Sequence, residues 1–153
     1  MQPSNQADTL AWLDTTLRQF VHYVARHPEF MRLMNDQGKR DSKRMRWLAD
    51  RFVRPMSQVV SAHIERAQVE GLMAPIPPVT LRYIVLGAAG LIFSQAPECK
   101  YIDGVDPTNP EFAERHTAAL LQLLTAGGKR WRSVQSRRAK GPSKRRPQSR
   151  TRA

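Results

Sequence analysis

The feature that most constrains the fold is residues 79–96, a stretch that is apolar on nearly every side of the helix it is expected to form. Its most apolar part, residues 83–93, is about eleven residues long, whereas a helix that crosses a membrane needs roughly 20. We therefore expect a helix that is buried on several faces, and we expect no membrane partner.

Amphipathic helices are predicted before this stretch, because apolar residues recur there at spacings of three and four. The first is expected from about Asp8 to His27. Pro28 then begins a second, short helix that Gly38 ends.

A third helix is expected to begin at Asp41 or Ser42, since either side chain can accept the free amides of a first turn. Pro55 predicts a break or a sharp kink at Arg54, because proline lacks an amide hydrogen and clashes one turn back. The helix that follows is expected to end at Gly71.

After the buried helix, Pro97 is expected to end the run, and residues 98–108 are expected to form a loop. Residues 109–111, Asn-Pro-Glu, predict the start of a final helix, with a cap, a first-turn proline and an acid at the positive end of the dipole. This helix is expected to stop at Gly127-Gly128. With no sustained period-two alternation, the predicted fold is all-α with about six helices.

Charge divides the chain into a nearly neutral body and a cationic end. Residues 127–153 hold eleven Lys and Arg and no acid, while the first 126 residues hold fourteen Lys and Arg against thirteen Asp and Glu. We expect a disordered N-terminus over residues 1–8, one helical domain over residues 9–126, and a disordered basic tail over residues 127–153.

The basic tail is a candidate nucleic-acid contact, since its cations can neutralise phosphates without sequence preference and its tryptophan can stack on an unpaired base. A solvated extension with no role explains the same composition equally well. The candidate residues are Lys129, Arg130, Trp131, Arg132, Arg137, Arg138, Lys144, Arg145 and Arg146.

The sequence carries no constellation that points to a metal, a cofactor or catalysis. His22 and His27 are five residues apart, which separates them by about 140° around a helix. No glutamate is followed three positions later by histidine, and no nucleophile elbow or phosphate-binding glycine loop occurs. The single cysteine, Cys99, excludes an internal disulfide, and the N-terminus resembles no secretory signal. We expect a cytoplasmic protein that is not an enzyme.

Two strings resemble the C-terminal regions of TetR-family (tetracycline-repressor-like) transcription regulators. One is FVHYVARHPEFMRLM at residues 20–34, and the other begins with Ile76-Pro77-Pro78 and includes GAAGLIFSQAPEC at residues 87–99. The resemblance covers roughly residues 8–126. It implies a small-molecule effector pocket and a four-helix dimer interface made by the last two helices of each subunit.

The family's DNA-reading helix-turn-helix needs on the order of 45 residues. Only about eight residues precede the first amphipathic helix, so we expect this chain to lack that module.

The expected effector pocket is a mostly apolar cavity with a few polar groups, and His63 is its best polar candidate, although each candidate also fits an ordinary core. The candidates are Phe20, Met31, Met34, Trp47, Met56, His63, Tyr83 and Phe93.

A homodimer is also expected from the residues themselves, because a chain this small has few helices with which to cover residues 79–96. The small residues at positions 87–90 allow close helix approach, either to a partner or within the chain. The expected interface residues are Leu81, Ile84, Val85, Ala88, Ile92, Phe112, His116, Ala119, Leu120 and Leu123.

Two functions follow from different features. The first is a TetR-type regulator domain that binds an effector and dimerises, and that reaches DNA only indirectly. The alternative is a dimeric nucleic-acid-binding protein that acts through its basic tail.

Overall fold

The computed structural model describes the backbone of residues 6–139 and the side chains of residues 6–128 and 136. The described residues form α1 (Gln6–Arg26), α2 (Pro28–Gly38), α3 (Lys43–Leu48), the π-helical turn η1 (Ala49–Val53), α4 (Arg54–Val69), α5 (Pro78–Ser94), α6 (Ala96–Asp103) and α7 (Pro110–Ala139). Because α3, η1 and α4 follow one another without interruption, the described part of the chain has six helical runs. The predicted all-α fold is confirmed.

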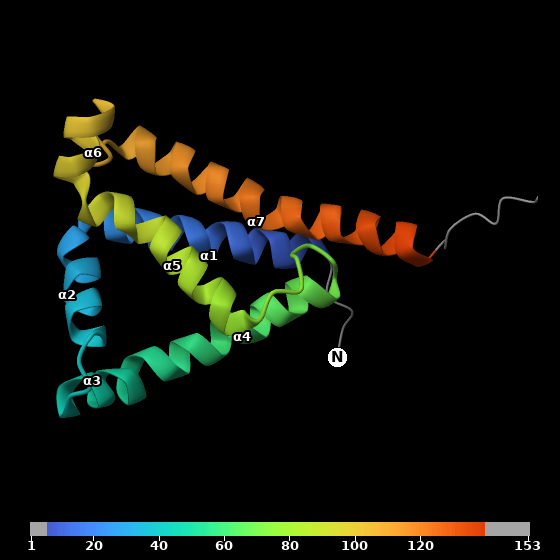
Figure 1. Cartoon of the computed structure of the whole chain (residues 1–153), viewed down its shortest axis with the longest axis horizontal. Helices are drawn as coiled ribbons and strands as arrows, with labels where there is room; N and C mark the ends of the chain where they lie inside the picture. Colours follow the sequence, from blue (N-terminus) through green and yellow to red (C-terminus); the bar gives the residue numbers. More distant parts are fainter. Residues whose placement is uncertain (1–5, 140–153) are drawn as a thin grey trace, which may run out of the picture.

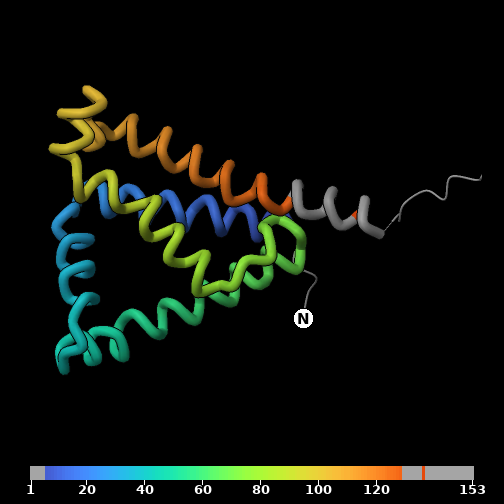
Figure 2. Tube along the Cα trace, viewed as in Figure 1, coloured from blue at the N-terminus to red at the C-terminus, as the bar shows by residue number. Residues whose placement is uncertain are grey.

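Three helices, α1, α5 and α7, form a layer, and the segment from α2 to α4 extends away from this layer and comes back to it (Figure 1). The helices α1, α5 and α7 pack against one another. From the end of α1, α2 leads away to α3, and the α3–η1–α4 run returns to meet both α1 and α5 (Figure 2). Helix α6 connects α5 to α7 at one corner of the molecule.

Two buried clusters hold this arrangement, and α5 contributes to both. The larger cluster contains Leu17, Val21, Val24, Met31, Ala89, Phe93, Ala113 and Leu120, from α1, α2, α5 and α7. The smaller cluster contains Ile64, Ala67, Met73 and Leu81, from α4, the loop after it and the start of α5. The buried residues of α5 lie on one side of the helix, whereas Val79, Tyr83, Ile84 and Leu91 on the other side are about half exposed or more. The prediction that residues 79–96 are buried on several faces is therefore wrong for the single chain, whose few helices cover only one side of α5.

Local signals place most helix ends where they were expected. The Ser42 side chain accepts a hydrogen bond from the amide of Met45 at 3.1 Å, and Asn109 accepts one from the amide of Glu111 at 2.9 Å. Gly71 follows α4 with a φ of +71°, a conformation that residues with a Cβ rarely adopt.

The expected break or kink before Pro55 takes the form of a π-helical turn. Leu48, Val53 and Arg54 all keep right-handed helical dihedrals, so the backbone is not broken. The amide of Arg54 donates to the carbonyl of Ala49, five residues back. Pro55 then lies in the first turn of α4, directly after the π-helical turn.

The prediction of a loop over residues 98–108 is wrong for its first half, which is α6. Pro97 lies in the first turn of this helix, a position to which proline is well suited. Gly104, with a φ of +65°, ends it, and Lys100 then pairs with Asp106. This contact, with hydrogen bonds from the hydroxyl and amide of Thr108, lowers the pKa of Asp106 to about 2.

The predicted end of the last helix at Gly127-Gly128 is also wrong, since α7 continues to Ala139. A Cβ at Gly128 would lie 2.5 Å from the carbonyl carbon and oxygen of Leu72, and one at Gly127 would lie 3.3 Å from the Cβ of Ala74. These glycines therefore allow α7 to approach the backbone that follows α4. Residues 129–139 and 6–8, expected to be disordered, are helical, while residues 140–153 lie outside the described part.

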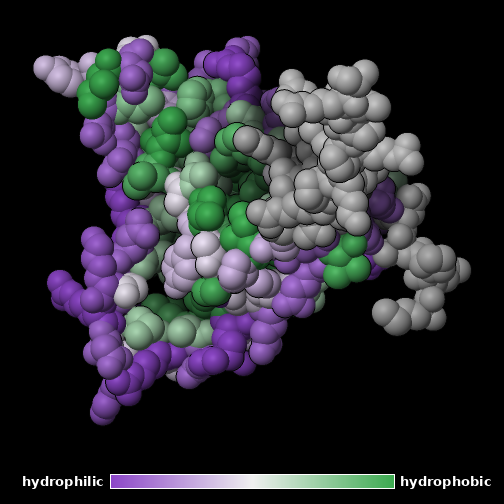
Figure 3. Space-filling model, turned by 45° about the vertical axis from the view of Figure 1, so that its right-hand side comes forward, coloured by the Kyte–Doolittle hydropathy of each residue, from purple (hydrophilic) through white to green (hydrophobic). Residues whose placement is uncertain are grey.

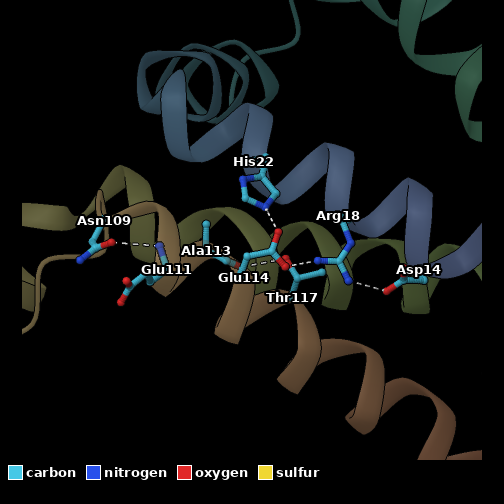
Figure 4. A network of polar contacts seen from close by, with 8 residues as sticks. All are labelled: Asp14, Arg18, His22, Asn109, Glu111, Ala113, Glu114 and Thr117. Carbon is cyan, nitrogen blue, oxygen red and sulfur yellow. Dashed lines mark hydrogen bonds and ion pairs between the residues drawn. The ribbon is translucent and has the colours of Figure 1, made fainter.

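A polar network joins α1 to α7 along their exposed side (Figure 4). Arg18 and His22 of α1 both contact the carboxylate of Glu114, and the His22 Nε2 to Glu114 Oε1 distance is 2.6 Å. Arg18 Nη2 also donates a hydrogen bond to Asp14 Oδ1 at 3.0 Å. The hydrogen bond from Arg18, followed by that from His22, lowers the pKa of Glu114.

Replacement of Gly128 by alanine is expected to destabilise the fold by about 1–3 kcal/mol, because the new methyl group would force α7 away from the Leu72 carbonyl. Urea unfolding, followed by far-ultraviolet circular dichroism, measures the effect. Gly38→Ala is the matched control, since a Cβ at Gly38 meets nothing within 4 Å. Equal midpoints for the two variants would contradict the close approach.

Replacement of Glu114 by glutamine is expected to lower the melting temperature at pH 7 and to have little effect below the folded pKa of this carboxyl. A lowered folded pKa means that the ionised form stabilises the fold above the unfolded pKa, and this contribution disappears as the pH falls through the folded value. Melting curves from pH 7 to pH 3 measure it. Glu65→Gln, an exposed site on α4 with no ion pair among the described residues, is the control. A pH-independent effect would rule out the ionic contribution.

Candidate functional site

Four exposed apolar side chains follow one another along the α3–η1–α4 run. Trp47 is 59% exposed, Phe52 56%, Met56 70% and Val59 55%. The Trp47 and Phe52 rings meet edge to face at 5.5 Å. The last three residues are spaced by four and three, which places them on one face of the helix. We call these four residues the apolar stripe.

The apolar stripe leads toward α1. His63 lies one turn beyond Val59, and its Nδ1 donates to the carbonyl of that residue at 2.9 Å. The imidazole stacks on Trp12 of α1, with ring centroids 3.7 Å apart and an interplanar angle of 10°. The stripe therefore extends along the side of α4 that faces α1. From this meeting point, α1 and α4 diverge toward α2 and α3 (Figure 1).

Basic residues concentrate around the same run. The cations between residues 39 and 54 are Lys39, Arg40, Lys43, Arg44, Arg46, Arg51 and Arg54. Arg46 hydrogen-bonds Asp41 at 2.6 and 2.8 Å and lowers the pKa of that carboxyl, while Arg54 pairs with Asp50 at 2.7 Å. In Figure 3, hydrophilic side chains cover the lower left corner, where α3 lies, and hydrophobic side chains gather toward the middle of that face.

The eight residues expected in an effector pocket do not come together. Met31 and Phe93 are 7% and 1% exposed in the larger buried cluster, and Phe20 packs against that cluster. Met34 is half-buried on α2, and Tyr83 is 66% exposed on α5. Only the remaining three candidates share the side of the α3–η1–α4 run that faces α1, namely Trp47, Met56 and His63.

Two open grooves lie elsewhere on the surface. One, of about 590 Å³, lies between α4 and α5 and is lined by Ser57, Ser61, Arg82 and Tyr83 among others. The Arg82 guanidinium lies 5.1 Å from the Tyr83 ring, and its Nε is buried without an acceptor. The other, of about 330 Å³, follows α1 past His22. Neither groove contains the apolar stripe, and of the eight expected pocket residues only Tyr83 lines one of them.

The α5 and α7 helices keep a second set of apolar side chains exposed. Ile84 is 50% exposed, Leu91 49% and Leu123 72%, and Ala88 and Ala119 are exposed as well. We call these five residues the α5–α7 face. Leu91 was not among the expected interface residues, although it lies seven positions after Ile84 and so on the same side of α5.

The two helices meet at this face. His116 Nε2 donates to the Ala88 carbonyl at 2.8 Å, and its ring stacks on Phe112 at 5.8 Å. Val85, Ile92 and Phe112 are half-buried around the larger cluster. Leu81 and Leu120, 3% and 8% exposed, lie inside this chain's own core. The expectation that these two leucines belong to an interface is therefore corrected, because no part of them is free to meet a partner.

Further observations concern sites of other kinds. Among residues 6–139, no three His, Cys, Asp or Glu side chains are placed to hold a metal ion. Within the same residues, no single helix is long and apolar enough to cross a membrane, and α5 and α6 reach that composition only as a pair bent by 74°. Cys99 is half-buried in α6, not in the expected loop.

The structure does not describe the side chains of the candidate nucleic-acid residues in the tail. Those between residues 129 and 138 lie on the backbone of α7, but their side chains are not described, and residues 144–146 lie beyond the described part. Their role stays a prediction.

Comparison with protein families gives a match to the tetracyclin repressor-like C-terminal domain over residues 4–130. Comparison with curated proteins and with solved structures gives no match. The match covers every helix described above, from α1 into α7, and both buried clusters. The chain therefore belongs to the family of tetracyclin repressor-like C-terminal domains.

Proposed function

We propose that this chain is the effector-binding and homodimerisation domain of a TetR-type transcription regulator and that it has no catalytic activity. The observation that carries the proposal is the α5–α7 face, which leaves apolar side chains of two packed helices exposed in a domain of this family. Large apolar side chains left exposed on neighbouring helices are typical of an interaction site.

A second copy of the chain fits the α5–α7 face. Two-fold symmetry places the same residues of both subunits opposite one another, so that α5 and α7 of each form a four-helix contact. Ile84 is 50% exposed and Leu123 72%, so burial of the surface that each still exposes contributes roughly 1–2 kcal/mol per side chain. Gly87 and Ala88 add little bulk, which allows the partner's helix to approach closely.

The apolar stripe is the proposed effector site. Its four side chains are exposed on the side of the α3–η1–α4 run that faces α1, and Met34 is half-buried on neighbouring α2. A thioether and two aromatic rings suit contact with an apolar ligand, because they offer large, adaptable apolar surfaces.

A direct connection between the effector site and the dimer helices is provided by α2. Met31 packs so closely on α5 that a Cβ at Gly90 would lie 2.7 Å from its terminal carbon. Arg32 donates from Nε and Nη2 to the Ser94 carbonyl at 3.0 and 2.9 Å, at the C-terminal end of α5. A ligand that moves α2 would therefore move α5 with it, and α5 forms half of the proposed interface.

Replacement of both Ile84 and Leu123 by glutamate is expected to convert the dimer to a monomer. The dissociation constant should rise on the order of 100-fold or more, because unpaired charges would be buried at the interface. Sedimentation equilibrium at low and high salt measures it. Val69→Glu, at a 90% exposed aliphatic residue of α4, is the matched control.

The wild-type dimer is expected to be insensitive to salt, since the α5–α7 face is apolar. A monomeric wild-type chain, or a double variant that dimerises as well as Val69→Glu, would overturn the proposed interface and the function that rests on it.

A further inference from the structure

We infer that the ligand of the apolar stripe is an amphipathic anion, that is, an apolar chain or ring that carries a carboxylate or phosphate group. This inference rests on the proposed function, which makes the stripe the effector site. It adds the chemical class of the effector, which follows from the charges beside the stripe.

The charge around the stripe is strongly one-sided. Seven of the fourteen Lys and Arg in the first 126 residues lie between residues 39 and 54, against only two acids, Asp41 and Asp50. Both acids are engaged by arginines of the same segment, Arg46 and Arg54. Arg40, Lys43, Arg44 and Arg51 are exposed and form no ion pair with any described residue. Within the first 126 residues, this segment is therefore the one that attracts anions most strongly.

Two of these free guanidinium groups flank the aromatic end of the stripe. Arg44 lies three residues before Trp47 and Arg51 lies four residues after it, so all three share one side of the helical run. Arginine binds carboxylate and phosphate oxygens through two parallel N–H donors. A ligand whose apolar part covers the Trp47 and Phe52 rings would place an acidic head group within reach of these donors.

The direction of the stripe favours a small amphiphile over a membrane. Met56 and Val59 lie on the side of α4 that leads to the Trp12–His63 stack and faces α1. A flat bilayer surface meets helices from outside, with the apolar face turned outward. An amphiphile of small size can instead lie between α4 and the helices that it faces.

A nucleic acid fits the stripe less well than an amphiphile. Successive unpaired bases stack on ring faces that lie parallel, but the Trp47 and Phe52 rings lie at 76° to each other. Met56 and Val59 have no ring on which a base could stack, although both are more than half exposed. Apolar chain or ring carbons are the ligand atoms that these two side chains suit.

Titration calorimetry with two probes of equal chain length tests the inference. The probes are decanoate and decyltrimethylammonium, below the concentrations at which they form micelles, added to the full chain. Decanoate is expected to bind at least about tenfold more tightly than the cation, and the Arg44→Gln/Arg51→Gln double variant is expected to lose about that factor for decanoate only. Trp47→Ala is expected to weaken both probes, since it removes shared apolar contact.

Arg26→Gln, at an exposed arginine of α1 with no ion pair among the described residues, is the matched control and should bind decanoate as the wild type does. Circular dichroism confirms that each variant is folded. Equal affinity for the two probes, an unchanged double variant, or no binding of decanoate would overturn the inference. Sedimentation of phosphatidylglycerol vesicles provides a further arm. Arginine-dependent binding to vesicles without binding of decanoate would assign the surface to a membrane and also overturn it.

Failure of the inference can be told apart from failure of the proposed function by sedimentation equilibrium on the same samples. A dimer that binds the cationic probe as well as decanoate retains the proposed function and refutes only the anionic class. A monomer refutes the proposed function whatever the probes do.

Discussion

The burial of α5 is the constraint on which the rest of the structure depends. Its N-terminal part enters one buried cluster through Leu81, and its C-terminal part enters the other through Ala89 and Phe93. A helix that is apolar all round requires neighbours on several sides, and α1, α2, α4 and α7 supply them on one side. These neighbours still leave Ile84 and Leu91 about half exposed. The same apolar composition that organises the monomer therefore leaves exposed the surface that we propose as the dimer interface.

Polar contacts at the helix edges decide how the elements around α5 are oriented. Arg32 reaches the last carbonyl of α5 from α2, and His116 reaches the Ala88 carbonyl from α7. Glu114 joins α7 to α1 through Arg18 and His22. Buried apolar contacts supply most of the stabilisation but are non-directional, whereas these hydrogen bonds have preferred geometries. They connect α2, next to the proposed effector site, with the two helices of the proposed interface.

The sequence predicted part of the candidate sites and missed part of each. Side-chain chemistry marked Trp47, Met56 and His63 as pocket candidates, and the structure places all three along the α3–η1–α4 run. This chemistry gave no means to separate them from Met31 and Phe93, which share it but lie in the core. The net charge of the first 126 residues is close to zero, and this average conceals the cationic segment between residues 39 and 54. Its significance depends on which side chains are paired, and pairing is a property of the folded chain.

What the sequence by itself determined is the helical class, five of the helical runs and most of their ends, although not α6, because caps, prolines and spacings of three and four act through local contacts within one or two turns. The signals at Ser42, Gly71 and Asn109 are of this kind. Only the tertiary structure decided the length of α7, since Gly128 serves a close approach to Leu72, 56 positions earlier in the numbering. Only it decided which apolar residues stay exposed. Both depend on contacts between residues distant in the chain, and no local pattern encodes such distances.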